Sequence, residues 1–134
     1  MPISYSLASL EPYLRSILRI VAGFTFSLHG YQKFFGVLGG LGGQRAELGS
    51  LMGVAGVLET FGGALILLGL FTRPAAFVLA GQMAVAYFMV HVHINFWPLL
   101  NMGEITVVYC FLFLWLSAAG AGPLSLDRAF GWKH

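Results

Sequence analysis

The fold is decided by the stretch LMGVAGVLETFGGALILLGLF, which occupies residues 51–71. Glu59 is the one charged residue within it. A transmembrane helix needs about 20 consecutive, mostly apolar residues, and this stretch satisfies that requirement. It also carries several glycines, among them Gly53, Gly56, Gly62 and Gly63. Small residues at this density let helix backbones approach closely, so we predict a membrane-spanning helix packed tightly against a neighbour.

The composition extends this prediction to the whole chain. Of the 134 residues, 58% are hydrophobic and only 9% are charged, whereas a soluble domain carries about 25% charged residues. Four spanning helices would use about 80 residues, which is close to the apolar content. We therefore predict an all-α protein, an integral membrane four-helix bundle that forms a single domain over residues 1–134.

The other three spans are expected at about residues 13–35, 75–92 and 101–119, followed by a short C-terminal tail. The glycine-rich residues 36–43 are expected to form a flexible connector. No small-residue cleavage site follows the first apolar segment, so we expect this segment to be retained and not removed as a signal peptide. Basic residues are more numerous on the side of the two termini than on the other, which places both termini in the cytoplasm. The two groups are Arg15, Arg19, Arg73, Arg128 and Lys133 against Lys33 and Arg45.

The same composition excludes several classes of function. A net charge of +2 without a basic cluster excludes a nucleic-acid-binding protein. A single cysteine, Cys110, excludes an intramolecular disulfide, a CxxC redox pair and a thiolate zinc site. The sequence contains no flavin, haem or iron–sulfur motif.

Buried ionisable residues are costly within a membrane and therefore mark candidate functional sites. Glu59 lies about 12 Å below the outer end of its span, at 1.5 Å per residue. By similar estimates of depth, six ionisable groups converge in the outer half of the bundle: His29, Lys33, Glu59, His91, His93 and Glu104. One interpretation is a pocket that binds a polar head group and exchanges protons. The alternative is a structural ion pair between Lys33 and Glu59.

Other polar residues leave further alternatives open. Gln82 lies in mid-span and needs a partner, either Glu59 or a backbone carbonyl. Arg19 is expected to extend to the inner interface or to pair with Asp127. His91 and His93 could join His29 and a glutamate around a metal ion. A His-x-His pair at a helix end is more typical of a membrane interface, and we therefore predict no metal site.

Several stretches together resemble the DoxX family of small bacterial membrane proteins. They are Leu18-Arg19-Ile20, His29-Gly30-Tyr31-Gln32-Lys33-Phe34, Leu58-Glu59-Thr60-Phe61-Gly62-Gly63, Leu68-Gly69-Leu70-Phe71-Thr72-Arg73, Asn101-Met102-Gly103-Glu104 and Gly122-Pro123-Leu124-Ser125-Leu126-Asp127. The resemblance implies a four-helix bundle in the bacterial cytoplasmic (inner) membrane. It also implies a link to quinone chemistry, because members are subunits of a thiosulfate:quinone oxidoreductase or are associated with resistance to toxic quinones and with thiol-oxidative stress.

On this basis the leading hypothesis is a quinone-interacting subunit of a membrane redox system. Glu59 would exchange a proton at the base of the pocket, and His29 and Lys33 would hydrogen-bond a quinone carbonyl. Glu104 would tune Lys33 or relay protons outward, while Gln82 and Trp97 would contact the quinone. Aromatic side chains could flank the ring or simply belong to the core, namely Phe26, Phe61, Tyr87 and Trp97.

Other functions and partners also fit the sequence. The chain could be a non-catalytic scaffold or assembly subunit that anchors a partner protein, with its buried charges serving packing alone. A carrier of small solutes or protons is a weaker fit, because no span is visibly broken at its midplane. The expected partners are membrane lipid, a redox subunit that supplies electrons and, through the glycine-rich face of residues 51–71, a second copy of the chain.

Overall fold

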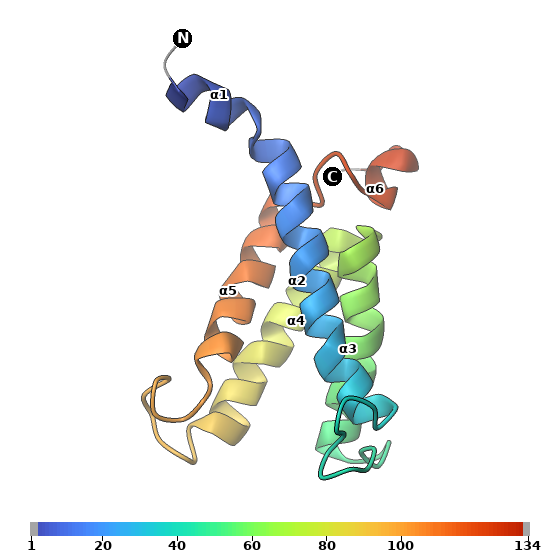
Figure 1. The fold of residues 1–134 in the computed structure, drawn as a ribbon, viewed down its shortest axis with the longest axis vertical. Coiled ribbons are helices and arrows are strands. Elements are labelled where there is room, and N and C mark those ends of the chain that lie inside the picture. The colour runs from blue at the N-terminus through green and yellow to red at the C-terminus, as the bar shows by residue number, and fades with distance from the viewer. Residues whose placement is uncertain (1–2, 133–134) are drawn as a thin grey trace.

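The computed structural model describes residues 3–132, and the fold consists of helices joined by short turns and two longer loops. In chain order the helices are α1 (Ile3–Ser9), α2 (Glu11–Phe34), α3 (Leu51–Leu68), α4 (Thr72–Ala86), the π-helix η1 (Tyr87–His91), α5 (Glu104–Ala119) and α6 (Leu126–Ala129). Helices α2 to α5 form the bundle, and α1 projects away from it (Figure 1). The predicted all-α helical bundle is thereby confirmed.

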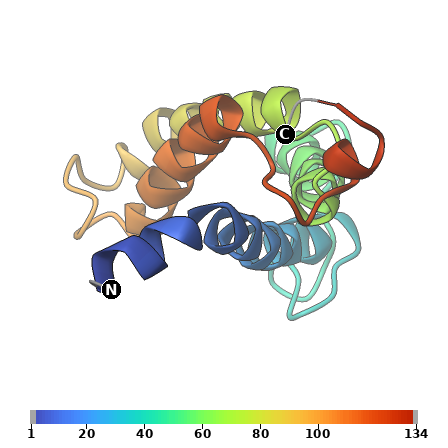
Figure 2. The ribbon, with the colours of Figure 1, turned by 90° about the horizontal axis from the view of Figure 1, so that it is seen from above.

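The bundle consists of two helical pairs. Helix α2 packs along α3, and α4 packs along α5, whereas the contact between α3 and α4 is less extensive. The pairs diverge toward the end that carries the loops at residues 35–50 and 92–103 (Figure 1). Viewed from above, α2 and α5 lie on different sides of the bundle (Figure 2). Phe26 of α2 and Phe113 of α5 connect the pairs, with ring centroids 4.8 Å apart.

Glycines of both helices bring α2 and α3 into close contact. Of the four glycines named from the sequence, Gly56 and Gly63 face α2, whereas the other two face other parts of the chain. Two glycines of α2 itself come closest to the backbone of α3. A β-carbon on Gly30 would lie 2.7 Å from the carbonyl carbon of Glu59. A β-carbon on Gly23 would similarly overlap the backbone of Leu67. No larger side chain can occupy these positions without separating the helices. This close contact places Lys33, near the end of α2, beside the carboxylate of Glu59.

Within residues 3–132, two helices are long and apolar enough to cross a membrane, namely α3 and the continuous segment Thr72–His91. Helix α5 is apolar but shorter. Large apolar side chains on the outer faces are exposed, including Phe77 and Phe111 at 65% each. The predicted limits of the spans and the cytoplasmic placement of both termini stay predictions.

Arg19 does not behave as the sequence predicts. Its side chain is fully buried and does not extend to an interface. It donates hydrogen bonds to the carbonyls of Ala121 at 2.9 Å, Ile66 at 2.6 Å and Leu67 at 2.7 Å, and also to that of Leu124. The last carbonyls of a helix lack intrahelical partners, so Arg19 supplies the donors that the end of α3 needs.

Asp127 has a separate role at the start of α4. Its carboxylate accepts hydrogen bonds from the backbone N–H of Phe71 at 2.7 Å and from that of Thr72 at 3.0 Å. It does not form the ion pair that was considered for Arg19: within residues 3–132 the ion pairs are Glu11–Arg15 and Lys33–Glu59. Asp127 thus caps α4 and attaches the C-terminal segment to the turn between α3 and α4.

Candidate functional site

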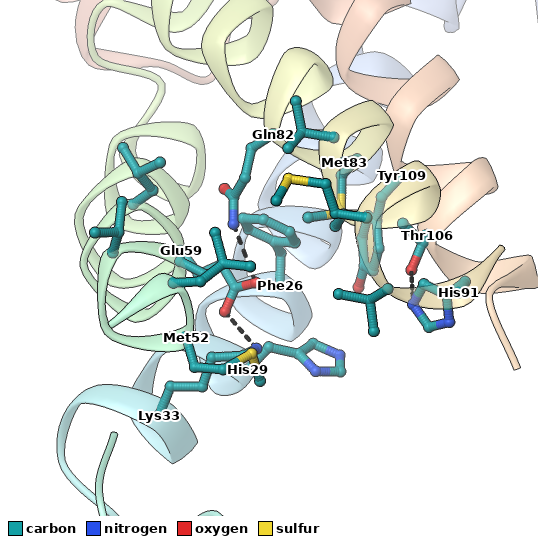
Figure 3. A pocket seen from close by; sticks show the side chains of 18 of the residues that line it. Phe26, His29, Lys33, Met52, Glu59, Gln82, Met83, His91, Thr106 and Tyr109 are labelled. Carbon is teal, nitrogen blue, oxygen red and sulfur yellow. Dashed lines mark hydrogen bonds and ion pairs between the residues drawn. The ribbon is translucent and has the colours of Figure 1, made fainter. Parts of the chain in front are cut away.

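A cavity of about 530 Å³ lies between the two helical pairs. Its walls come from α2, α3, α4, η1 and α5, together with Met102 of the loop at residues 92–103. Most of the lining is apolar, and a few polar groups point into it (Figure 3). Pockets that bind small molecules commonly have volumes of about 300–1,000 Å³ and this mixture of apolar walls and few polar groups.

Glu59 is the centre of the polar group on the α2–α3 side of the cavity. Its Oε2 lies 2.7 Å from Nζ of Lys33, and the two side chains are only 6% and 13% exposed. Its Oε1 accepts a hydrogen bond of 3.2 Å from Nε2 of Gln82 on α4. The carboxylate therefore links three helices (Figure 3). Of the two partners predicted for Gln82, the structure selects Glu59.

His29 lies one turn before Lys33 on α2 and lines the same cavity. Its imidazole is exposed and meets the ring of Tyr109 edge to face, with centroids 6.5 Å apart. The hydroxyl of Tyr109 forms a hydrogen bond of 2.8 Å with Oγ1 of Thr25 and not with His29. Within the described residues the ring of His29 has no hydrogen-bond partner, so it is available to a bound molecule.

His91 occupies the η1–α5 side of the cavity. Its Nδ1 lies 3.0 Å from the carbonyl oxygen of Asn101, and its Nε2 lies 3.3 Å from Oγ1 of Thr106. Asn101 is fully buried. Its amide nitrogen donates to the hydroxyl of Tyr87 at 3.1 Å, which fixes the loop at residues 92–103 against η1.

Three of the predicted site residues lie outside the cavity. His93 and Trp97 are exposed on the loop after η1, and Glu104 is exposed at the first residue of α5. The depth estimate for Glu104 was wrong because α5 begins at Glu104 and not near Asn101. Four of the six ionisable groups expected to converge therefore line the cavity, namely His29, Lys33, Glu59 and His91.

The lining also contains residues that do not stand out in the sequence. Of the aromatic residues for which a place beside the ring or in the core was left open, Phe26 lines the cavity and also belongs to the core, whereas Phe61 and Tyr87 do not line it. Tyr109 of α5 is a second aromatic residue in the lining of the cavity. Four methionines also line it: Met52, Met83, Met89 and Met102. Methionine is flexible and polarisable and makes favourable contacts with aromatic rings. No single one of these residues indicates a pocket in the sequence, because each is typical of an apolar helix. They indicate one only when they are seen together around the cavity.

Comparison with known proteins identifies the family. Residues 14–92 match the DoxX family model. This chain belongs to the DoxX family. It is also 43% identical over 129 residues to a protein of Haemophilus influenzae described as an uncharacterized protein, and the match covers 93% of this chain and 96% of that relative. No solved structure matches the chain.

Membership of the DoxX family confirms the resemblance predicted from sequence and makes the chain a membrane protein. The matched residues extend from α2 to the end of η1. They therefore include Lys33, Glu59, Gln82 and His91, whereas Thr106 and Tyr109 lie on α5, beyond the match.

A metal ion is not suggested by the geometry of this DoxX protein. Within residues 3–132 no group of three or more His, Cys, Asp or Glu side chains is arranged to hold one. His93, which the metal alternative requires, is exposed outside the cavity. The polar groups of the cavity instead form an ion pair and separate hydrogen-bonding positions on different walls.

Proposed function

We propose that this DoxX-family membrane protein is a quinone-interacting subunit of a membrane redox system, and that the cavity holds the quinone head group. The observation that carries the proposal is the buried Lys33–Glu59 pair, which borders a mainly apolar cavity inside an apolar bundle. A quinone has an apolar ring with polar oxygens at its edge, and these match the two kinds of surface in the cavity.

The individual side chains suit a quinone and its reduced form. The ammonium of Lys33 and a protonated ring nitrogen of His29 can donate hydrogen bonds to a carbonyl oxygen. The carboxylate of Glu59 can accept a hydrogen bond from a hydroxyl of the reduced form. Phe26 and Tyr109 offer aromatic surfaces to the ring. When bound, the quinone would supply the electron-transfer chemistry, and an electron donor would come from a partner subunit or from the substrate.

A purely structural role for the ion pair is a weaker explanation. Contact between α2 and α3 is already secured by Gly23 and Gly30, which leave no space between the helix backbones. Burying two charges costs several kcal/mol per ion before their attraction is counted. An ion pair that is not needed to join two helices, and that borders a cavity, is better explained by a bound molecule. We do not include Glu104 or Trp97 in this site, because neither lines the cavity.

The direct test is to measure quinone that remains bound to the protein after purification in mild detergent. Mass spectrometry would compare wild type, Glu59→Gln and Glu47→Gln. Glu47 is a matched control, because it is exposed in the loop before α3 and lies outside the cavity. We expect quinone to be retained by wild type and by Glu47→Gln and to be lost from Glu59→Gln.

Equal amounts of quinone in all three proteins would contradict the proposal, because detergent carry-over would then account for the signal. A protein that co-purified equally with all three variants would instead favour the scaffold alternative.

A further inference from the structure

The cavity has a second polar position, formed by His91 and Thr106, on the wall made by η1 and α5. Lys33 and Glu59 lie on the wall made by α2 and α3. In Figure 3 the two positions face the cavity from different sides, with Phe26 and Tyr109 between them. The proposed quinone site uses the first position, and the second remains to be explained.

The hydrogen bonds of His91 determine which nitrogen carries the proton. The carbonyl oxygen of Asn101 can only accept, so Nδ1, 3.0 Å away, must donate. In a neutral imidazole one nitrogen donates and the other accepts. Nε2 is therefore the acceptor. Its contact is the hydroxyl of Thr106 at 3.3 Å, which is longer than a typical hydrogen bond.

The local backbone holds His91 in this orientation. The N–H of Val92 bonds the carbonyl of Tyr87 at 3.0 Å, five residues earlier, which is the π-helical spacing. A π-turn of this kind is one way in which a helix ends, and here it makes His91 the last helical residue before the loop. The buried Asn101 ties the following loop to Tyr87. Nδ1 of His91 therefore anchors the ring to the backbone of Asn101. Nε2 lies at the cavity, where its contact with the Thr106 hydroxyl is long.

We infer that the cavity selects a reduced ring that carries a hydroxyl on one edge and an oxygen on the opposite edge, which means a 1,4-hydroquinone and not a 1,2-isomer. His91 Nε2 accepts a hydrogen bond from a hydroxyl on one edge, and Lys33 donates to the oxygen on the opposite edge. The oxygens of a 1,2-isomer lie on adjacent carbons, so they reach only one of the two positions. This inference rests on the proposed function and adds to it the class of reduced quinone that the cavity prefers.

The test is a binding titration of the full chain in detergent under anaerobic conditions. The ligands are a 1,4-dihydroxybenzene and a 1,2-dihydroxybenzene that carry the same alkyl chain. One hydrogen bond gained or lost in a site of this kind changes affinity by roughly tenfold. We expect wild type to bind the 1,4-isomer about tenfold more tightly than the 1,2-isomer.

Two variants test whether the preference for the 1,4-isomer depends on His91. His91→Asn keeps an amide donor close to the position of Nδ1 but removes Nε2, so it should bind both isomers equally. His93→Asn is the matched control, because His93 is exposed two residues further on and lies outside the cavity. His93→Asn should keep the full preference.

A third ligand tests the same point without any mutation. A 1,4-dimethoxy analogue cannot donate to Nε2, so wild type should bind it about tenfold more weakly than the 1,4-dihydroxy compound. Equal affinity of wild type for the two isomers, or a preference that survives in His91→Asn, would overturn the inference. If Glu59→Gln still abolished binding of both isomers in that case, the proposed quinone site would stand. Failure of wild type to bind any of the ligands would overturn both.

Discussion

Lys33 of α2 and Glu59 of α3 form an ion pair of 2.7 Å at the wall of an apolar cavity, with both side chains almost completely shielded from solvent. Such a pair depends on both members, because removal of one leaves an uncompensated buried charge. Gln82 adds a hydrogen bond to the free oxygen of Glu59. The carboxylate of Glu59 therefore contributes to the stability of the bundle and also forms part of the polar wall of the cavity.

Removing Lys33 alone should destabilise the protein. We expect Lys33→Met to lower the free energy of unfolding by about 3 kcal/mol, because breaking one member of a buried ion pair costs about 3–5 kcal/mol. The double variant Lys33→Met/Glu59→Leu should recover most of this loss, since no charge remains buried. Unfolding in mixed detergent, followed by circular dichroism, measures both values. A double variant as unstable as Lys33→Met would show that the unpaired charge is not the cause.

Gly30 should not tolerate a side chain. In Gly30→Ala the new methyl group would lie 2.7 Å from the carbonyl carbon of Glu59, so the helices must separate. Overpacking of this kind costs about 1–3 kcal/mol. Gly81→Ala is the control, because a β-carbon at Gly81 meets nothing within 4 Å. That change should be neutral or stabilising, as alanine favours the helix by roughly 0.5–1 kcal/mol. Equal thermal stability of the two variants would argue against close α2–α3 contact.

Asp127 should stabilise the start of α4 through its carboxylate. Replacing an N-terminal helix cap by alanine costs about 0.5–2 kcal/mol, so Asp127→Ala should lower the melting temperature. Asp127→Asn should lower it less, because asparagine keeps one acceptor oxygen. Hydrogen exchange of the Phe71 and Thr72 amides, which bond to this carboxylate, should increase in the same order. No change in exchange in Asp127→Ala would contradict the cap.

The helices, and the tight packing of the glycine-rich helix against a neighbour, could be predicted from the sequence because they depend on composition and spacing. Lys33 and Glu59 were predicted to meet from their depths in two long helices, where the rise per residue is regular. Arg19 could not be assigned in this way. Its partners are backbone carbonyls of α3 and of residues 121–124, which only the tertiary structure brings together.

The loop that follows η1 is the part of the site that was hardest to predict. Residues 92–103 have no periodic pattern, so their path and the starting point of α5 could not be inferred. The π-helix at Tyr87–His91 also has no signature in the residue types. For these reasons Glu104, Trp97 and His93 were expected in a pocket that they do not line, and Tyr109 was not selected.

Glu104 distinguishes the site predicted from sequence from the site seen in the structure. It is exposed at the N-terminus of α5 and does not line the cavity. Glu104→Gln should therefore leave quinone retention unchanged within about twofold, since a removed contact would reduce it by roughly tenfold. The measurement is quinone per protein by mass spectrometry beside Glu59→Gln. A loss in Glu104→Gln as large as that in Glu59→Gln would restore the role in tuning Lys33 or relaying protons.

Whether the cavity holds a quinone can be tested by cross-linking the protein with a photoreactive quinone in membranes and locating the labelled residues by mass spectrometry. The account predicts labels on residues that line the cavity, such as Met52, Met83 and Tyr109, and predicts that excess unmodified quinone and Glu59→Gln both remove them. Labels confined to the outer faces, on residues such as Phe77 and Phe111, or labels unaffected by competition, would contradict a quinone site in the cavity.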